Sequence, residues 1–234
     1  MMANVYFVAG TDTEVGKTFS SCALLAAANS KGLSSMALKP IAAGADEYKD
    51  ANDKVSMRNE DAVALMSHMS VDLPYSQVNP VLLKEAASPH IAAALEKRTP
   101  SASRITGICR GALMKKPDFA LIEGAGGWRV PISPRETMAD LARQLNYKVI
   151  LVVGLRLGCL NHAMLSAEAI RRDGLEIAGW VANSLSRETM SYEAENIATL
   201  SSALGAPLIA HLPFSESGKP EELCKYVNLD CLDL

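Results

Sequence analysis

Glycine, lysine and threonine residues near the start of the chain stand in an order suited to holding a phosphate group. The segment runs Gly10-Thr11-Asp12-Thr13-Glu14-Val15-Gly16-Lys17-Thr18. Glycine lets backbone N–H groups turn toward an anion, and a helix that begins here adds further unpaired N–H groups. Lys17 can reach the β- and γ-phosphates of a nucleotide, and the Thr18 hydroxyl can bind Mg²⁺. The residue types therefore predict nucleotide binding.

The segments on either side are those that a phosphate-binding loop requires. Val5-Tyr6-Phe7-Val8-Ala9 is apolar and predicts a strand, whereas residues 19–30 are rich in Ala, Leu and Ser and predict a helix. Five residues separate Gly10 from Gly16, one more than in the general pattern. The alternative is an ordinary strand-to-helix turn. The order strand, loop, helix favours the phosphate loop.

Glu123 is the first candidate metal ligand from another part of the chain. It follows the apolar run Phe119-Ala120-Leu121-Ile122, which predicts a buried strand. A carboxylate at such a strand end can hold Mg²⁺ directly or through water, although a purely structural acid is the alternative. The glycines that follow in Gly124-Ala125-Gly126-Gly127 would let a ligand approach the backbone closely.

Lys39 and Asp61 are weaker candidates on their own. Lys39 follows the short apolar run at 35–38 and precedes Pro40, which holds its backbone extended. A cation there would point across the site toward the phosphates, but a solvated surface lysine is also possible. Asp61 lies at the start of a predicted helix, where a first-turn acid that stabilises the helix is the simpler interpretation.

The elements that must position these residues alternate between strand and helix. Apolar runs predict strands at 4–9, 35–38, 119–122, 148–153, 176–181 and 207–210, with a short one at 79–83. Helices are predicted at 17–31, 58–68, 91–97, 101–115, 137–145, 160–172 and 188–204. Residues 44–58 lack periodicity and predict a mobile surface loop, and the tail to Leu234 predicts irregular structure.

Strands that are apolar throughout and alternate with helices predict a mostly parallel sheet covered on both faces. Ligands bind such sheets beyond the carboxyl ends of the strands, where the loop at 10–18, Lys39, Glu123 and Asn183 all fall. We therefore expect one α/β domain over residues 1–234 with a P-loop NTPase-like fold.

Composition argues against several functional classes. The chain of 234 residues is 49% hydrophobic and carries a net charge of −3, which is no footprint for nucleic acid or an anionic membrane. No run approaches the length of a membrane span, and the N-terminus lacks the layout of a signal peptide. Five cysteines with no CxxC pair favour reduced thiols and a cytoplasmic location.

Seven motifs together resemble the dethiobiotin synthetase family over nearly the whole chain. In that family the phosphate loop has the same five-residue spacing. The motifs are residues 10–18, Lys39-Pro40, Asn59-Glu60-Asp61-Ala62, Ser88-Pro89-His90, Glu123-Gly124-Ala125-Gly126-Gly127-Trp128, Leu157-Gly158-Cys159-Leu160-Asn161-His162-Ala163 and Ala178-Gly179-Trp180-Val181-Ala182-Asn183.

The resemblance implies an ATP- and Mg²⁺-dependent reaction in biotin synthesis. CO₂ would add to one amine of 7,8-diaminopelargonic acid to give a carbamate. A carbamate oxygen would then attack the γ-phosphate of ATP, releasing ADP and leaving a carbamic–phosphoric anhydride. The second amine would close the ureido ring of dethiobiotin and expel phosphate. Such a reaction needs positioning and charge neutralisation rather than a protein nucleophile.

The resemblance also implies roles for individual residues. Lys17 and Lys39 would neutralise the carbamate and the γ-phosphate beside Thr13, and Thr18, Asp61 and Glu123 would hold Mg²⁺. Nucleotide-binding residues would be Glu14, Val15, Gly16, Lys17, Thr18, Phe19, Asp61, Glu123, Gly124, Ala125, Gly126, Asn183, Ser184, Leu212, Pro213 and Phe214. Family members are homodimers, so the helix start at Gly158, Cys159, Leu160 and Asn161 would bind the substrate carboxylate from the partner chain.

Three features depart from the family pattern. Ala43 stands four residues after Lys39, where the family usually has Ser or Thr, so a hydroxyl contact to substrate is missing or is replaced by the Gly44 backbone or water. Asn183 is followed by Ser184 rather than Asp, a change that concerns nucleotide preference. The segment at 44–58 is longer than expected.

Three other functions compete with this one. A partition-type ATPase, a nucleotide switch of related fold, would carry an extra lysine in the phosphate loop, and none lies between Gly10 and Lys17. An ATP-dependent amide-forming enzyme of cobalamin synthesis would add a glutamine-hydrolysing domain, for which the chain is too short. A catalytically silent homologue is the third alternative, which Ala43 leaves open and against which the intact Lys17, Lys39 and Glu123 argue.

Overall fold

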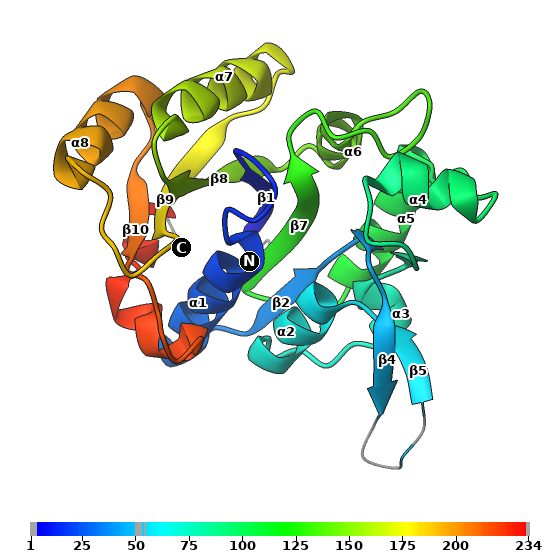
Figure 1. The fold of residues 1–234 in the computed structure, drawn as a ribbon. Coiled ribbons are helices and arrows are strands. Elements are labelled where there is room, and N and C mark those ends of the chain that lie inside the picture. Colours follow the sequence, from blue (N-terminus) through cyan, green and yellow to red (C-terminus); the bar gives the residue numbers. More distant parts are fainter. Residues whose placement is uncertain (1–3, 50–52, 54, 233–234) are drawn as a thin grey trace.

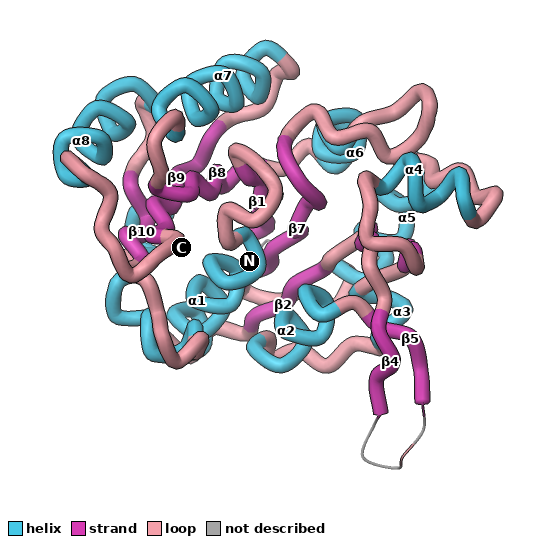
Figure 2. The backbone as a smooth tube through the Cα atoms, viewed as in Figure 1, coloured by secondary structure: helices cyan, strands magenta, loops and turns pink. Residues whose placement is uncertain are grey.

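Six parallel strands form the central sheet of the computed structural model, which describes residues 4–49, 53 and 55–232. Their spatial order is β10-β9-β8-β1-β7-β2 (Figures 1 and 2). Their bounds are β1 Asn4–Gly10, β2 Ser35–Leu38, β7 Phe119–Gly127, β8 Lys148–Leu155, β9 Ile177–Ser184 and β10 Leu208–Leu212. The predicted mostly parallel α/β sheet is confirmed.

Both faces of the sheet are buried, because successive side chains of a strand point to opposite sides. In β1, Tyr6 and Val8 belong to one apolar cluster and Phe7 and Ala9 to the other. The first cluster is covered by α1 (Lys17–Ser30) and by two 3₁₀ helices near the C-terminus. The other is covered by four helices, α5 Ala102–Leu113, α6 Met138–Leu145, α7 Cys159–Arg172 and α8 Glu193–Leu204.

Short elements between β2 and α5 build a wall beside the carboxyl end of β2 (Figure 1). They include a small parallel sheet, in which Ile41 pairs with Val81. These elements are β3 Ile41–Ala43, α2 Glu60–His68, α3 Tyr75–Val78, β6 Val81–Leu83 and α4 Pro89–Leu95. The predicted strand at 79–83 is β6, whereas β3 and α3 were not expected from the sequence.

The segment at 44–58 is not the irregular loop that the sequence predicts. It forms an antiparallel hairpin of β4 (Asp46–Lys49) and β5 (Val55–Arg58), visible as a projecting arm in Figure 2. The Arg58 guanidinium lies 4.2 Å from the ring centre of Tyr48 and 5.0 Å from that of Tyr75. Both strands are largely exposed, so they lack the apolar alternation that reveals a half-buried strand. Residues 50–52 and 54 lie outside the described residues.

Two element boundaries and the tail differ most from expectation. The glycine segment 124–127 continues strand β7 instead of forming a loop. Helix α8 begins at Glu193 rather than at 188, because Tyr192 has a left-handed backbone with φ 57°. The tail contains the two 3₁₀ helices η1 (Pro220–Tyr226) and η2 (Leu229–Leu232). The two 3₁₀ helices pack Leu223, Leu229 and Leu232 against the α1 side of the sheet.

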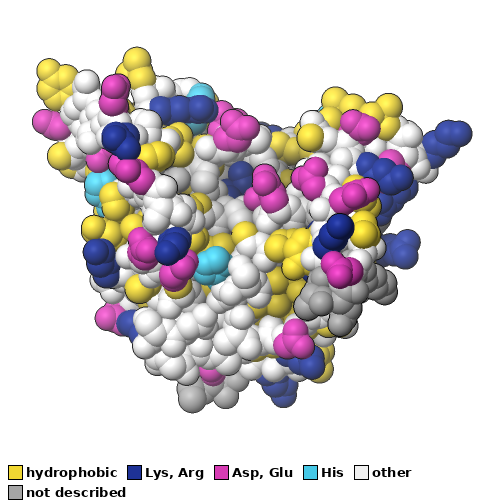
Figure 3. All heavy atoms as spheres, turned by 60° about the horizontal axis from the view of Figure 1, so that its bottom comes forward, with side chains coloured by type: hydrophobic (Ala, Val, Ile, Leu, Met, Phe, Trp, Pro, Cys, Tyr) yellow, Lys and Arg dark blue, Asp and Glu magenta, His cyan; other side chains and the backbone are white. Residues whose placement is uncertain are grey.

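The described residues include no helix with the length and apolar character needed to cross a bilayer. On the face shown in Figure 3, acidic and basic side chains are interspersed.

Candidate functional site

The phosphate-binding loop joins β1 to α1 in a conformation that requires its second glycine. Gly16 precedes the helix with φ 81°, and a Cβ added there would overlap the Asn183 amide group. Thr11 N–H donates to the Val152 carbonyl over 3.0 Å, which fixes the loop above β8. Glu14 also has a left-handed backbone, with φ 58°. The loop is therefore held in an unusual conformation by its contacts with neighbouring strands.

Lys17 begins α1 and is buried. Its Nζ donates to the backbone carbonyl of Asp12 over 3.0 Å, so the side chain folds back across its own loop. Burial, together with the nearby positive charge of Lys39, lowers the pKa of Lys17 to about 8, although acidic neighbours raise it in part. The ammonium is thus poorly compensated by the protein, which favours the binding of an anion beside it.

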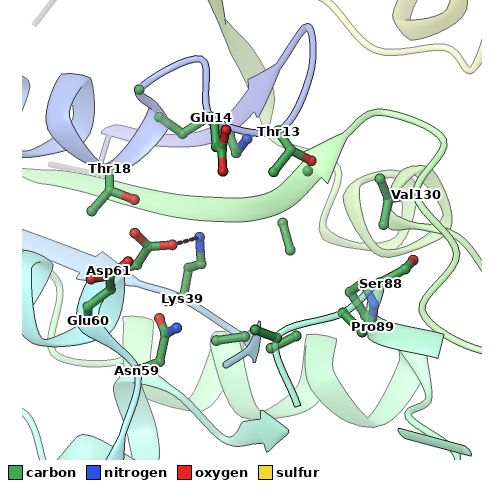
Figure 4. Close-up of a pocket in the computed structure, with 18 of the residues that line it drawn as sticks. Thr13, Glu14, Thr18, Lys39, Asn59, Glu60, Asp61, Ser88, Pro89 and Val130 are labelled. Atoms are coloured by element: carbon green, nitrogen blue, oxygen red, sulfur yellow. Dashed lines mark ion pairs between the residues drawn. The ribbon is translucent and has the colours of Figure 1, made fainter. Parts of the chain in front are cut away.

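Lys39 lies just after β2, and its backbone is fixed by three neighbours. Its N–H donates to the Val78 carbonyl over 2.9 Å, its carbonyl accepts from Asn79 over 2.6 Å, and Pro40 follows. The side chain is buried. Its Nζ lies 2.7 Å from Asp61 Oδ2 and 2.7 Å from Glu123 Oε1, and Figure 4 shows the contact with Asp61.

Glu123 is completely buried in β7 and is held by α1 as well as by Lys39. The Thr18 hydroxyl donates to Oε1 over 2.6 Å, and the Ser21 hydroxyl donates to Oε2 over 2.8 Å. Thr18 and Ser21 are three residues apart and so lie on the same face of the helix. Ser21 was not identified from the sequence, although this spacing from Thr18 was a signal that could have found it.

The charges of this cluster stabilise one another. Burial alone lowers the pKa of Lys39, but Glu123 and Asp61 outweigh it, and the net pKa is raised. Burial likewise raises the pKa of Asp61, but Lys39 and Thr18 bring it below its ordinary value. Lys39 is therefore an ammonium and Asp61 a carboxylate at neutral pH.

A cavity of about 680 Å³ opens between the phosphate loop and the elements after β2. One wall carries Thr13, Glu14, Lys17 and Thr18, and Figure 4 shows Lys39, Asp61 and Asn59 facing them from below. The remaining lining residues are mostly small or apolar; they are Gly16, Phe19, Ala42, Ala43, Glu60, Ala86, Ala87, Ser88, Pro89, Ala125, Gly126 and Val130.

Most of the predicted phosphate and metal residues thus meet at one cavity. The cavity is also lined by residues 86–89 and by Val130, for which the sequence predicted no role. Ala43, which is predicted to lie near the substrate, also lines the cavity. At Gly126, which has φ 62°, an added Cβ would meet Thr13 and Val130, so the backbone passes close to the loop.

The predicted adenine-binding residues lie together beside the phosphate loop and do not line this cavity. Asn183 donates to the Val15 carbonyl over 3.0 Å, and in the sheet register Leu212 of β10 lies beside Asn183 of β9. Pro213 and the half-exposed Phe214 follow directly. Among the described atoms, Asn183 Oδ1 is buried without a hydrogen-bond partner. The Ser184 hydroxyl donates to Glu193 Oε2 over 3.4 Å.

The predicted substrate residues 158–161 do not line the cavity of their own chain. They form the start of α7, where Gly158 has φ 96° and Cys159 is buried. Arg156, just before them, forms an ion pair of 2.6 Å with Asp12 of the phosphate loop.

The donor atoms at the cavity suit a magnesium ion. Thr18, Asp61 and Glu123 offer one hydroxyl and two carboxylates, all hard oxygen ligands, and the first two line the cavity. Mg²⁺ is commonly held by one or two carboxylates together with nucleotide phosphates and water. The residues therefore fit the ion that the sequence predicts.

Comparison with known proteins gives concordant results. The family described as "AAA domain" matches residues 4–222. A protein named ATP-dependent dethiobiotin synthetase from Cellvibrio japonicus is 50% identical, covering 91% of this chain and 90% of that protein. One of the same name from Marinobacter nauticus is 47% identical, covering 98% and 97%.

Solved structures show the same fold at low sequence identity. A ParA family ATPase from Chlorobium tepidum has a TM-score of 0.56 at 13% identity, covering 99% of both chains. The septum site-determining protein MinD from Pyrococcus horikoshii, complexed with Mg-ADP, has a TM-score of 0.54 at 18% identity, covering 94% of this chain and 86% of that one. These likenesses confirm the predicted P-loop NTPase fold.

Proposed function

Because the chain belongs to the ATP-dependent dethiobiotin synthetase family, we propose that it converts 7,8-diaminopelargonic acid, CO₂ and ATP into dethiobiotin, ADP and phosphate. It is an ATP-dependent ligase, and this reaction is the one in biotin synthesis that the family name implies. The observation that carries the proposal is the convergence of Lys17, Lys39 and Thr18 on one cavity beside two carboxylates.

The proposed steps use positioning and charge rather than a protein nucleophile. CO₂ adds to one amine, which loses a proton to give the carbamate; a carbamate oxygen displaces ADP from the γ-phosphorus. The second amine then attacks the carbamate carbon, and phosphate leaves as the ring closes. Lys17 and Lys39 neutralise the anionic groups, and Thr13 donates a hydrogen bond beside them. Mg²⁺ held by Thr18, Asp61 and Glu123 would neutralise phosphate charge.

Nucleotide and substrate would occupy different parts of the site. The Asn183 Oδ1 that lacks a partner among the described atoms would accept a hydrogen bond from the adenine amino group, with Leu212, Pro213 and Phe214 against the ring. The cavity near Ala43 would hold the diamine. In a homodimer, residues 158–161 of the partner chain would bind the substrate carboxylate.

Phosphate release from MgATP, measured with and without the diamine and bicarbonate, tests the proposal. We expect phosphate release only when both co-substrates are present, together with a product that has the mass of dethiobiotin. Lys39→Ala should abolish the phosphate release and the product. Release that is indifferent to the diamine would instead indicate a nucleotide switch of the partition type. Bound nucleotide with no release would indicate a silent homologue.

A further inference from the structure

Lys39 lies where the proposed function places a metal ion. Its Nζ lies between Asp61 and Glu123, 2.7 Å from one oxygen of each. The Glu123 oxygen concerned, Oε1, also accepts from the Thr18 hydroxyl. Asp61 and Glu123 are two of the three side chains proposed to bind Mg²⁺, and the third, Thr18, contacts the same Glu123 oxygen, so the ammonium and the ion would compete for the two carboxylates.

The ammonium has no donor to spare in this arrangement. A lysine offers three N–H donors. Two go to the carboxylates, and a third contact of 3.3 Å reaches the Gly124 carbonyl. In this position Lys39 cannot also hold the phosphate or carbamate, yet the proposed reaction requires it to do so.

The carboxylates need a positive charge between them. The Glu123 side chain is 0% exposed and that of Asp61 is 35% exposed, so their mutual repulsion is only partly screened by solvent. Either the lysine or a divalent cation can supply the charge. When an ion takes this place, the positive charge of Lys39 becomes available to anions in the adjoining cavity.

The local structure allows the side chain to move while its backbone stays fixed. Lys39 N–H and carbonyl are both hydrogen bonded, to Val78 and Asn79, so the main chain is anchored. The side chain is unbranched with four rotatable bonds, and it borders the cavity.

We propose that Lys39 is an internal substitute for the metal ion, and that binding of the ion between Asp61 and Glu123 displaces the lysine toward the anions of the cavity. This inference rests on the proposed metal site. It makes metal binding the event that changes Lys39 from a counter-ion of the carboxylates into a group that binds substrate.

Binding of Mn²⁺ alone to the nucleotide-free protein, measured by electron paramagnetic resonance, tests the exchange. We expect Lys39→Met, which keeps the length and removes the charge, to bind Mn²⁺ about tenfold more tightly than wild type. Lys17→Met is the matched control, since Lys17 lines the same cavity but donates to the Asp12 carbonyl and not to the carboxylates. Its effect should be clearly smaller. Equal or weaker Mn²⁺ binding by Lys39→Met would overturn the inference.

Chemical labelling gives a second measurement in the wild-type protein, in case Lys39→Met does not fold. An amine-reactive reagent should modify Lys39 slowly without metal and several-fold faster with saturating Mn²⁺, as read by peptide mass spectrometry. Unchanged protection would contradict displacement.

The variant Glu123→Gln separates failure of the inference from failure of the metal site. Mn²⁺ binding that is lost in Glu123→Gln but unaffected by Lys39→Met leaves the metal site intact and removes only the exchange. If Glu123→Gln binds Mn²⁺ with the same affinity as wild type, both the proposed metal site and the exchange are wrong. Phosphate release still tests the overall reaction independently.

Discussion

At the scale of single residues, Gly16 packs the phosphate loop closely against strand β9, which is distant in sequence. Its φ of 81° and the adjacent Asn183 amide both exclude a side chain. Asn183 in turn donates to the Val15 carbonyl. The loop conformation and the predicted adenine-binding residue are therefore parts of one contact.

Gly16→Ala should both destabilise the protein and weaken nucleotide binding. A left-handed alanine alone costs about 1–2 kcal/mol, and displacement of Asn183 adds to that. Gly32→Ala is the control, since Gly32 also has a positive φ of 76° but has no atom within 4 Å of an added Cβ. Chemical denaturation and nucleotide titration would measure the two effects. Equal losses for the two variants would contradict the role of the Asn183 contact.

Ala43 invites the opposite kind of change, the addition of a group. It lines the cavity at the position where the family usually carries a hydroxyl. Ala43→Thr should lower KM for the diamine about fivefold, the value of one added hydrogen bond, with kcat little changed. Ala43→Val has the same shape without the hydroxyl and should not lower KM. Equal KM values for the two variants in steady-state kinetics would show that the hydroxyl has no partner in the site.

At the scale of elements, α6 illustrates a helix whose start is fixed by its sequence. Thr137 and Asp140 form a capping box, in which Thr137 N–H and its hydroxyl each donate to Asp140 Oδ2 over 2.8 Å. Burial raises the pKa of Asp140, but the Thr137 hydrogen bonds and Arg143 outweigh it, so the net pKa is lowered. The carboxylate form thus stabilises the folded protein.

The stability difference between wild type and Asp140→Asn should depend on pH. A carboxyl whose pKa is lower in the folded protein contributes stability above its unfolded pKa, near 3.9, and that contribution is lost as pH falls through the folded pKa. Urea unfolding at pH 7 should show a loss of about 1 kcal/mol, shrinking below pH 4. Thr137→Ser, which keeps the hydroxyl, should lower the free energy of unfolding less than Thr137→Ala does. A difference that stays constant with pH would rule out the capping carboxylate as its source.

At the scale of the whole molecule, the residues predicted for the site fall in two separate places of one chain. The cavity contains the predicted phosphate and metal residues, while residues 158–161 lie elsewhere at the start of α7. Homodimer formation, a single domain over residues 1–234 and a cytoplasmic location all stay predictions. The first of these can be tested by complementation.

A heterodimer of two inactive variants should regain activity if each site uses two chains. Lys39→Met damages the cavity, and Asn161→Glu places a negative charge where the substrate carboxylate would bind. In a heterodimer purified through two different tags, one site combines both intact parts, so activity should be about half that of wild type. The two homodimers are the controls. No activity in the heterodimer would indicate that each chain supplies its own residue 161, or that no shared site exists.

The sequence by itself determined the kinds of residues in the site and the elements that carry them. Lys39 and Glu123 could be found because each directly follows a short apolar run, and Lys17 because its loop follows another; a parallel sheet brings the segments after such runs to one edge. The six strands of the central sheet and most helices follow from local apolar patterns, which need no knowledge of distant residues. The exposed hairpin at 46–58 was missed for the same reason, because its strands bury too little to show a pattern.

Only the tertiary structure decided what these residues contact. Lys39 meets Glu123 across 84 positions of sequence, and Asn183 meets Val15 across 168. Ser21 became a partner of Glu123, and the 86–89 segment became the far wall of the cavity. Such contacts depend on strand order and on how far each side chain reaches, and neither is encoded in a local pattern. The same packing decided that Lys39 neutralises two carboxylates, a position that no motif predicts.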